Sequence, residues 1–246
     1  MKNKIRLCLA VLFVVTICSG CEKEDESFLI YSLNGEKLCT DDLNGAYHSE
    51  VNVQGFTTHF YWGFSHGGGY FWTLGVNGWE GQIFIVKIDR ISPDGTLTEF
   101  PAPPELTYLG GSWEVGFDYA DDYLWIALDN YNPIKIYRVD PITLETELKY
   151  LINIDDYANM YCMAIDENED IIYLAIGEAV LNYFSKYDLY SGEYLGRIDC
   201  SYPMILEMAT SSDYIWIVAP SLHRIDKRTG EIIFIDAIAG ADGIAF

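Results

Sequence analysis

The chain has 246 residues, of which 37 are acidic and 15 are basic, so its formal net charge at pH 7 is −22. Nucleic acids and anionic lipid surfaces bind positively charged proteins, and this composition therefore excludes both as default partners. Half of the residues are apolar, with 19 Tyr and 6 Trp among them. Aromatic and β-branched residues between frequent Gly, Asn and Asp turns favour an all-β fold.

Residues 1–20 have the three parts of a secretory signal peptide. Three basic residues precede an apolar run of 11 residues, Leu7 to Ile17, which is too short to cross about 30 Å of hydrocarbon as a helix. The next residues, Ser-Gly-Cys at 19–21, resemble the lipobox of bacterial lipoproteins, in which the signal is cut before the cysteine and the sulfur receives a diacylglycerol. The resemblance implies lipidation of Cys21; an ordinary cleaved signal with an incidental cysteine is the alternative.

Residues 21–27, CEKEDES, are too polar to pack and are expected to form a solvated tether. An acidic stretch directly after the lipidated cysteine resembles the export signal of surface lipoproteins in Bacteroides-like bacteria. The resemblance implies an outer-membrane protein anchored at the cell surface; a spacer that faces the periplasm is the alternative. Without residues 1–20 the chain carries 12 basic and 37 acidic groups, a formal charge of −25.

The remainder of the chain contains an internal repeat. Four apolar segments carry an aromatic residue at their third position, and these residues are spaced 53, 48 and 43 positions apart: Trp72, Trp125, Tyr173 and Trp216. Each segment follows another apolar segment and precedes a basic–apolar–polar triplet and a turn. Four short strands at a period of about 40–50 residues are the signature of β-propeller blades. The aromatic of the second strand is expected to pack between blades.

The repeat predicts an all-β propeller of four-stranded antiparallel blades over residues 28–246. Full blades are expected at about 58–112, 113–158, 159–203 and 204–239, with a partial blade at 28–57 and the first strand of a further blade at 240–246. Residues 28–38 match the third and fourth strands of the repeat. We therefore expect an incomplete ring of six or seven blades; the alternative is a closed five-bladed ring in which residues 28–57 supply three strands.

Residues 88–105, IDRISPDGTLTEFPAPPE, resemble the blade repeat of streptogramin B lyases, and residues 223–234 echo it. The resemblance covers about one blade well and three loosely. It implies a metal-dependent site built from His and Glu on late blades, but His223 is the only histidine after residue 66 and nothing around it reproduces such a site. More broadly, the repeats are similar to those of YncE-like and NHL-like propellers, which implies a binding scaffold.

Three residues outside the second strands are candidates for ligand contact. His66 stands beside three glycines in SHGGGYFW, residues 65–72, where a phosphate-binding loop would need a following helix and a strand is expected instead. Trp79 and Trp113 are flanked by glycine and are expected in loops, where an indole can stack on a sugar ring or a partner loop. Core packing is the alternative for both tryptophans.

The sequence predicts no metal and no other cofactor. Asp166, Asn168 and Asp170 have the spacing of calcium-loop ligands, but the glycine and the distal glutamate of such a loop are absent from this stretch, so we interpret them as turn residues. No CxxC or Cys/His cluster is present.

Three cysteines follow Cys21 in the sequence: Cys39, Cys162 and Cys200. Cys162 lies in an apolar strand pattern and is expected to behave as a small buried hydrophobe. A bridge between Cys162 and Cys200 is left open by the sequence.

Together these patterns predict a lipid-anchored, surface-facing propeller that binds a glycan, a peptide or an envelope protein, and that meets the membrane only through its anchor. We assign no catalytic residue. The alternative is a lyase or hydrolase whose site lies on blades absent from this sequence, where His and Glu should line the central channel. A third interpretation is a structural part of a larger envelope complex.

Overall fold

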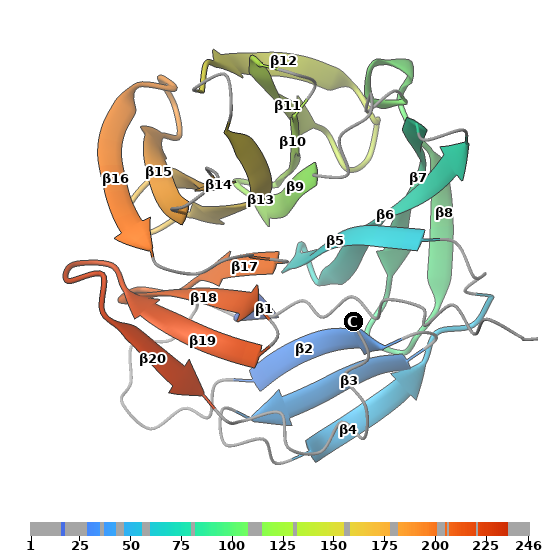
Figure 1. The fold of residues 1–246 in the computed structure, drawn as a ribbon. Coiled ribbons are helices and arrows are strands. Elements are labelled where there is room, and N and C mark those ends of the chain that lie inside the picture. Colours follow the sequence, from blue (N-terminus) through green and yellow to red (C-terminus); the bar gives the residue numbers. More distant parts are fainter. Residues whose placement is uncertain are drawn as a thin grey trace, which may run out of the picture.

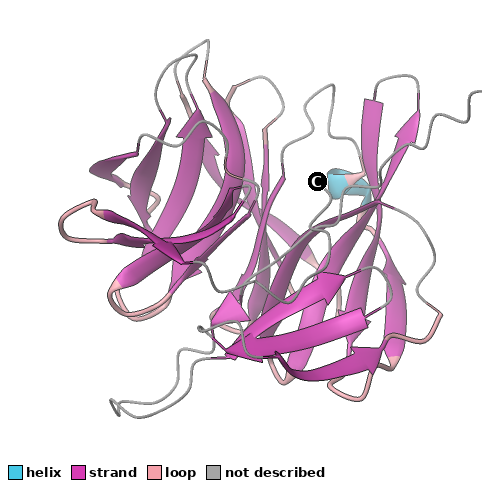
Figure 2. Ribbon diagram, turned by 60° about the horizontal axis from the view of Figure 1, so that its bottom comes forward, coloured by secondary structure: helices cyan, strands magenta, loops and turns pink. Residues whose placement is uncertain are grey.

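In the part of the chain that it describes, the computed structural model contains β-strands and one short 3-10 helix, η1 (Pro104–Leu106) (Figures 1 and 2). It describes residues 16–17, 29–34, 37–42, 47–55, 60–79, 82–107, 115–129, 132–154, 158–177, 182–200, 205, 207–219 and 221–235. Among these residues there is no helix with the length and apolar character that a membrane span requires.

The described strands form five four-stranded antiparallel sheets. The first contains β1 (Thr16–Ile17), β2 (Leu29–Asn34), β3 (Lys37–Asp42) and β4 (Tyr47–Asn52). The second contains β5 (Phe60–Gly67), β6 (Tyr70–Trp79), β7 (Gln82–Ile91) and β8 (Leu97–Pro101). The third contains β9 (Val115–Ala120), β10 (Tyr123–Leu128), β11 (Ile134–Val139) and β12 (Thr146–Ile152).

The last two sheets repeat the same order along the chain. The fourth contains β13 (Asn159–Asp166), β14 (Ile171–Gly177), β15 (Asn182–Asp188) and β16 (Tyr194–Cys200). The fifth contains β17 (Glu207–Thr210), β18 (Tyr214–Ala219), β19 (Ser221–Asp226) and β20 (Ile232–Ile235). Each strand of these sheets pairs with the next one in the sequence, so every sheet is a meander.

The five sheets surround a common axis as the blades of a propeller, with the first strand of each sheet innermost (Figure 1). Contacts between inner strands run from β5 to β9, β13 and β17, and β1 contacts both β17 and β5. The prediction of an all-β propeller with four-stranded antiparallel blades is therefore confirmed.

The strands differ in sequence according to their distance from the axis. The second strand β10, YLWIAL, is buried at every position after Tyr123, because both of its faces pack against neighbouring blades. The outermost strand β12, TELKYLI, is exposed at Glu147, Leu148 and Leu151, because its outer surface meets solvent. Continuous apolar runs thus mark second strands, and mixed patterns mark outer strands.

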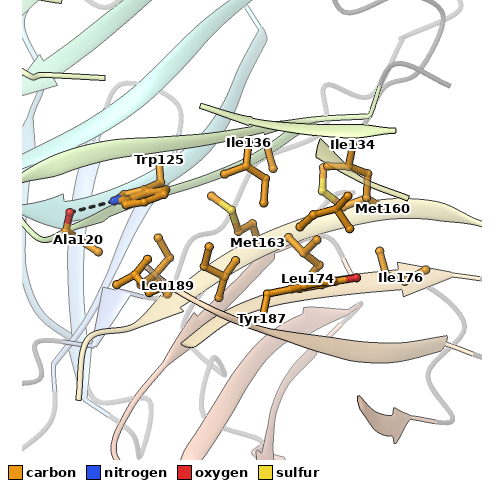
Figure 3. Close-up of a cluster of buried hydrophobic side chains, with 14 of the residues drawn as sticks. Ala120, Trp125, Ile134, Ile136, Met160, Met163, Leu174, Ile176, Tyr187 and Leu189 are labelled. Atoms are coloured by element: carbon orange, nitrogen blue, oxygen red, sulfur yellow. Dashed lines mark hydrogen bonds between the residues drawn. The ribbon is translucent and has the colours of Figure 1, made fainter. Parts of the chain in front are cut away.

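The aromatic residues of the second strands lie in the apolar layers between blades. Trp72 belongs to the cluster between the second and third sheets, and Trp125 to the cluster between the third and fourth (Figure 3). Tyr173 lies in the cluster between the fourth and fifth sheets. Their exposed fractions are 2%, 2% and 1%, so the expected packing between blades is confirmed.

The N-terminal strands differ from the arrangement that the repeat favoured. Residues 28–38 were expected to be the third and fourth strands of a blade, but β2 and β3 are the second and third strands of theirs. Residues 29–52 supply three strands, as in the alternative interpretation, and the inner place is taken by β1. Sequence matching misplaced these strands because their hairpin resembles the last hairpin of the other blades.

The sheet topology excludes a bridge between Cys162 and Cys200. Both are buried in the same apolar cluster, as expected for Cys162. Cys162 lies on the inner strand β13, however, whereas Cys200 ends the outer strand β16 of the same sheet. Three strand spacings amount to about 14 Å, and a disulfide requires Cα atoms within roughly 7 Å.

Replacing Trp125 by alanine should lower the free energy of unfolding by about 3–5 kcal/mol, because the indole is fully enclosed between two blades. Phe234, which is 57% exposed on β20, is the aromatic control; its replacement by alanine should cost no more than about 1 kcal/mol. Chemical denaturation of both variants measures the difference. An equal loss in the two would contradict the assignment of Trp125 to the core.

Candidate functional site

The turns between first and second strands are fixed by the buried aromatic of the second strand. The indole N–H of Trp72 donates to the carbonyl of Gly67, and that of Trp125 donates to the carbonyl of Ala120, each at 3.1 Å. In the fifth sheet, the indole of Trp216 donates to the hydroxyl of Ser211 at 3.1 Å. The same residue therefore anchors the blade core and the backbone of the turn above it.

The turns between third and fourth strands are fixed by an aspartate. The Oδ1 atoms of Asp140, Asp188 and Asp226 each accept hydrogen bonds from the backbone N–H groups two and three residues later, at 2.7 to 3.1 Å. For Asp140 and Asp226 these backbone donors are the main reason why the carboxyl pKa is lowered; for Asp188 the Ser191 hydroxyl contributes most. The polar residue of the repeated triplet is thus a turn-forming residue.

The basic residue of the triplet stacks on an aromatic ring of the second strand. The guanidinium of Arg138 lies 4.1 Å from the ring centre of Tyr123, and that of Arg224 lies 4.6 Å from the ring centre of Tyr214. Such stacking holds the third strand against the second and buries the aliphatic stem of the arginine. These arginines therefore serve the blade and add little positive charge to the turns.

Both kinds of turn lie at the same end of each antiparallel sheet, and contacts between sheets join them into one surface. We call this surface the turn face and define it as the turns at residues 67–69, 92–96, 121–122, 140–145, 167–170, 189–193, 211–213 and 227–231. The N–H of Asp121 donates to the carboxylate of Glu167 in the next sheet. The hydroxyl of Tyr150 on β12 donates to the carbonyl of Leu189 in the next sheet at 2.6 Å.

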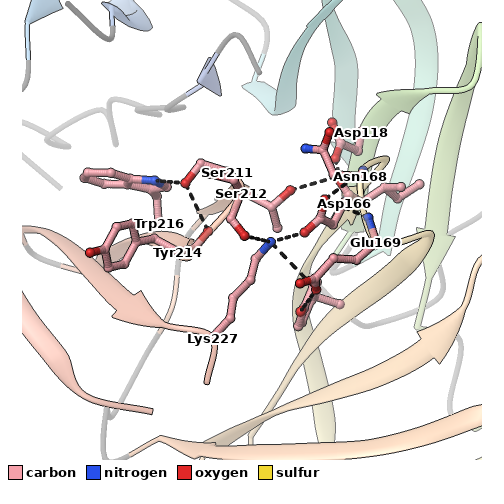
Figure 4. A network of polar contacts seen from close by, with 12 residues as sticks. Asp118, Asp166, Asn168, Glu169, Ser211, Ser212, Tyr214, Trp216 and Lys227 are labelled. Atoms are coloured by element: carbon pink, nitrogen blue, oxygen red, sulfur yellow. Dashed lines mark hydrogen bonds and ion pairs between the residues drawn. The ribbon is translucent and has the colours of Figure 1, made fainter. Parts of the chain in front are cut away.

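Lys227 joins the turns of the fourth sheet to those of the fifth sheet (Figure 4). Its ammonium pairs with the carboxylate of Asp166 at the end of β13 and lies 4.0 Å from that of Glu169. Asp166 also accepts hydrogen bonds from the N–H groups of Asn168 and Glu169, so the predicted turn at 166–170 is confirmed. The side chain of Lys227 is 7% exposed, and burial lowers its pKa to about 8.

The turn face is strongly acidic. Its exposed carboxylates come from the second, third, fourth and fifth sheets: Asp94, Asp121, Asp122, Glu145, Glu167, Glu169, Asp170, Glu193, Asp213 and Glu231. Arg228 is the one exposed basic side chain in the same turns. The face therefore has a large excess of negative charge.

Carboxylates on the outer strands are arranged differently. Glu50 pairs with Lys37, Glu99 with Lys87, Glu147 with Arg138 and Asp199 with Arg197. Each of these pairs compensates charge locally. Among the described residues, the excess negative charge is thus concentrated on the turn face rather than spread over the blades.

The axis of the propeller holds a second polar group, centred on Asp118 of β9. One carboxylate oxygen accepts a hydrogen bond from the hydroxyl of Ser65 on β5 at 2.6 Å. The other accepts from the backbone N–H of Ile165 on β13 at 2.7 Å. Burial raises the pKa of Asp118 to about 6, against the lowering effect of these donors. One carboxylate therefore connects the inner strands of three blades.

Two further contacts complete a circuit around the axis. The hydroxyl of Thr210 on β17 donates to the carbonyl of Ile165 at 2.8 Å. Glu207, also on β17, accepts a hydrogen bond from the backbone of Phe64 on β5. Burial, and to a lesser degree the charge of Asp118, raises the pKa of Glu207 well above its usual value. Side-chain contacts thus link β5, β9, β13 and β17 and return to β5.

The predicted ligand residue His66 packs into its own blade. Its imidazole lies against Phe71, with ring centres 4.8 Å apart, and burial lowers its pKa. The adjacent glycines also have a packing role, because a Cβ atom on Gly67 would lie 1.8 Å from the ring of Tyr119. The ring of Tyr119 therefore explains the glycine at position 67, whereas Gly68 and Gly69 have φ angles of +61° and +79°, which favour glycine.

His66 and Trp79 do not belong to one site. His66 pairs with Phe71 near the turn face, whereas Trp79 is the last residue of β6 and pairs with Gln82 at the opposite end. Eight residues of strand separate the two levels, which is about 26 Å. Trp113 and the lipidation candidate Cys21 lie outside the described residues, as do residues 240–246.

Sequence reasoning missed Asp118, Glu207 and Lys227. A signal for Asp118 existed, because it occupies the position that pairs with the second-strand aromatic, where the other blades have Ser65, Ala164 and Ala209. A carboxylate at a position of small residues is unusual. Glu207 and Lys227 gave no such signal, since their partners lie on distant parts of the chain.

Neither a protein-family model nor a curated protein matches the sequence. Similar solved structures exist: a chain of the nidogen/laminin complex has a TM-score of 0.58 at 8% identity, over 90% of this chain and 78% of that chain. Hydrazine synthase from Kuenenia stuttgartiensis gives 0.50 at 12% identity, over 94% and 68%. A gluconolactonase from Xanthomonas campestris gives 0.52 at 12% identity, over 84% and 71%. At these identities the likeness shows the propeller fold alone.

Asp118 should make stability depend on pH. Because its pKa in the folded chain is about 6 and its ordinary value is 3.8, the folded state binds this proton more tightly than the unfolded chain does. Its contribution is therefore full below about pH 4 and is lost as the pH rises through about 6. The difference in unfolding free energy between the native protein and Asp118→Asn should fall over this range, as measured by denaturation at a series of pH values.

Asp94→Asn is the matched control, because the hydroxyl of Ser92 and the backbone of Thr96 lower the pKa of Asp94 instead. The difference in unfolding free energy between this variant and the native protein should stay constant between about pH 5 and 7, because the carboxyl of Asp94 is already ionised there. If the difference in unfolding free energy between the native protein and Asp118→Asn does not change with pH, the burial of an ionisable group at the axis is contradicted.

Proposed function

We propose that this protein is a binding module that presents its turn face to a positively charged peptide or protein. The observation that carries the proposal is the uneven distribution of charge. Exposed carboxylates on the outer strands are paired with Lys or Arg, whereas ten exposed carboxylates of the turn face stand with one exposed basic side chain. A concentrated field of one sign attracts and orients a partner of the opposite sign.

Two further properties of the turn face support binding. Its turns are held by buried indoles and by aspartates that bind the turn backbone, so the face needs little ordering when a partner arrives. Ile142 and Tyr190 project from neighbouring turns and are 85% and 65% exposed. Apolar and aromatic tips beside carboxylates suit a cationic segment that also carries apolar side chains.

We infer a structural rather than a catalytic role for the buried carboxylates of the polar axis. Asp118 and Glu207 accept hydrogen bonds from the backbone of neighbouring strands, which is a structural task. A general acid or base must instead reach a proton of the substrate. The exposed carboxylates of the turn face meet solvent instead, and their concentrated charge favours binding of a cation-bearing partner.

We further propose that the module is a lipoprotein of the outer membrane, held through Cys21 with its body at the cell surface. The signal at residues 1–20, the Ser-Gly-Cys sequence and the acidic tether at 21–27 support this location. An acidic body is repelled by anionic lipid, which keeps the turn face available to a partner.

Neutralising the turn face should weaken binding more than neutralising an equal charge elsewhere. The test variant combines Asp121→Asn, Glu167→Gln, Asp170→Asn and Asp213→Asn. The control variant combines Glu50→Gln, Glu99→Gln, Glu147→Gln and Asp199→Asn, and has the same net charge. With an arginine-rich nonapeptide as the probe, fluorescence anisotropy at low salt should show a loss of affinity of about tenfold or more for the first variant and less than about threefold for the second.

Equal losses in the two variants would mean that the peptide responds only to net charge, and the turn face would not be a site. Repeating the titration at 0.3 M salt adds a second check. The difference between the variants should shrink, because the Debye length then falls to about 6 Å.

Replacing Cys21 by alanine should release the protein from membranes, because the thiol that carries the lipid is gone. Fractionation of the producing cells and mass spectrometry of the native protein measure this. A Cys21→Ala variant that still sediments with membranes would overturn the proposed anchor. Protease treatment of intact cells, with a periplasmic protein as control, distinguishes the cell surface from the periplasmic face.

A further inference from the structure

Three turns between third and fourth strands share one backbone frame, at residues 140–145, 188–193 and 226–231. In addition to the contacts of the leading aspartate, the N–H of the first residue donates to the carbonyl of the sixth at 2.9 to 3.0 Å. The N–H of the fifth residue donates to the carbonyl of the first at 2.8 to 2.9 Å. The N–H of the sixth residue donates to the hydroxyl of the fourth at 3.2 to 3.3 Å. The frame therefore depends on the side chains of its first and fourth residues.

The third residue of the frame is the exposed tip of each turn, and it differs in all three: Ile142, Tyr190 and Arg228. The frame uses only the backbone N–H of this residue. The second residue faces inward instead, since Leu189 is buried and the side chain of Lys227 is 7% exposed. An apolar, an aromatic and a basic tip all occur on the same frame, so the fold of the turn does not require a tyrosine at position 190. Its exposed ring is available for contact with a partner.

Tyr190 stands among carboxylates that come from two sheets. Its hydroxyl donates to the carboxylate of Asp170 in the fourth sheet. The charge of Asp170 is the main reason why the pKa of Tyr190 is raised, and the charge of Asp121 in the third sheet adds to it. A ring face beside carboxylates binds cations, and a planar guanidinium suits it best because it can stack on the ring and donate to the carboxylates at the same time.

The protein uses the same combination of ring and carboxylate to hold its own arginines. The guanidinium of Arg138 lies 4.1 Å from the ring centre of Tyr123 and pairs with the carboxylate of Glu147 at 2.8 Å. In the part of the chain that the structure describes, no Arg or Lys lies over the ring of Tyr190. The combination recurs on the next blade with three other residues: Arg197, Tyr183 and Asp199.

We propose that an arginine of the bound partner stacks on the ring of Tyr190 and pairs with the carboxylates of Asp170 and Asp121. This site rests on the proposed function of the turn face, and it adds recognition of arginine to the attraction of positive charge. A lysine ammonium gains the charge interaction but not the planar stack. The neighbouring tips do not offer the same site, because Ile142 has no aromatic ring and Arg228 repels a guanidinium.

The experiment compares a nonapeptide of arginine with a nonapeptide of lysine by fluorescence anisotropy at low salt. The native protein should bind the arginine peptide about fivefold more tightly or better, and Tyr190→Leu should lower this ratio by about threefold or more. Tyr190→Phe keeps the ring and should stay within about twofold of the native ratio. Tyr194→Leu is the matched control, because Tyr194 is an exposed tyrosine of the same sheet outside the turn face, and it should leave the ratio unchanged.

Tyr190→Leu should also keep the thermal midpoint within about 2 °C of the native value, because the side chain takes no part in the frame. A ratio that Tyr190→Leu leaves unchanged, or that Tyr194→Leu lowers equally, would overturn the arginine site.

The turn-face variant with four neutralised carboxylates separates this failure from a failure of the proposed function. If that variant weakens binding of both peptides while Tyr190→Leu leaves the ratio unchanged, the turn face binds cations but has no arginine site. If it weakens binding of neither peptide, the proposed function and the arginine site are both overturned.

Discussion

The propeller depends on the hydrogen bonds that connect its inner strands around the axis. Apolar packing between blades is strong but does not specify direction, and neighbouring blades share no continuous sheet. Asp118 provides direction, because its two oxygens bind Ser65 of one blade and Ile165 of another. Thr210 and Glu207 carry the connection through β17 and back to β5. The cost of burying two carboxyl groups is offset because each accepts hydrogen bonds, and their raised pKa values reflect that burial.

The charge of the turn face depends on how the blade core supports the turns at the ends of the blades. One tryptophan can serve the apolar layer with its ring and the turn with its N–H, as Trp125 does. The turns are therefore held through their backbone, and their exposed positions can carry charge. Arg138 and Arg224 do not add exposed positive charge to these turns, because they stack on tyrosines along the blades. The acidic character of the face thus arises from where the basic residues are used as well as from the number of acidic ones.

Much of the fold could be predicted from the sequence because the repeat is local. Trp72, Trp125 and Tyr173 recur at intervals of 53 and 48 residues. Each lies in the layer between blades, as expected. The N-terminal hairpin was misplaced because hairpins of similar pattern occur at two positions within a blade. Little of the site could be predicted in this way. Gly67, beside His66, is explained by Tyr119, a residue more than fifty positions away. The partners of Glu207 and Lys227 are also far away in the sequence.

The sequence by itself determined the secondary structure and the blade repeat, together with the overall negative charge. Each of these follows from neighbouring residues or from composition, and needs no knowledge of which blades meet. The tertiary structure decided which residues meet around the axis and which end of the blades collects the charge. It also decided that Cys162 and Cys200 lie on opposite edges of one sheet. These features depend on the closing of the sheets around a common axis, which brings together side chains that the sequence separates by roughly one blade or more.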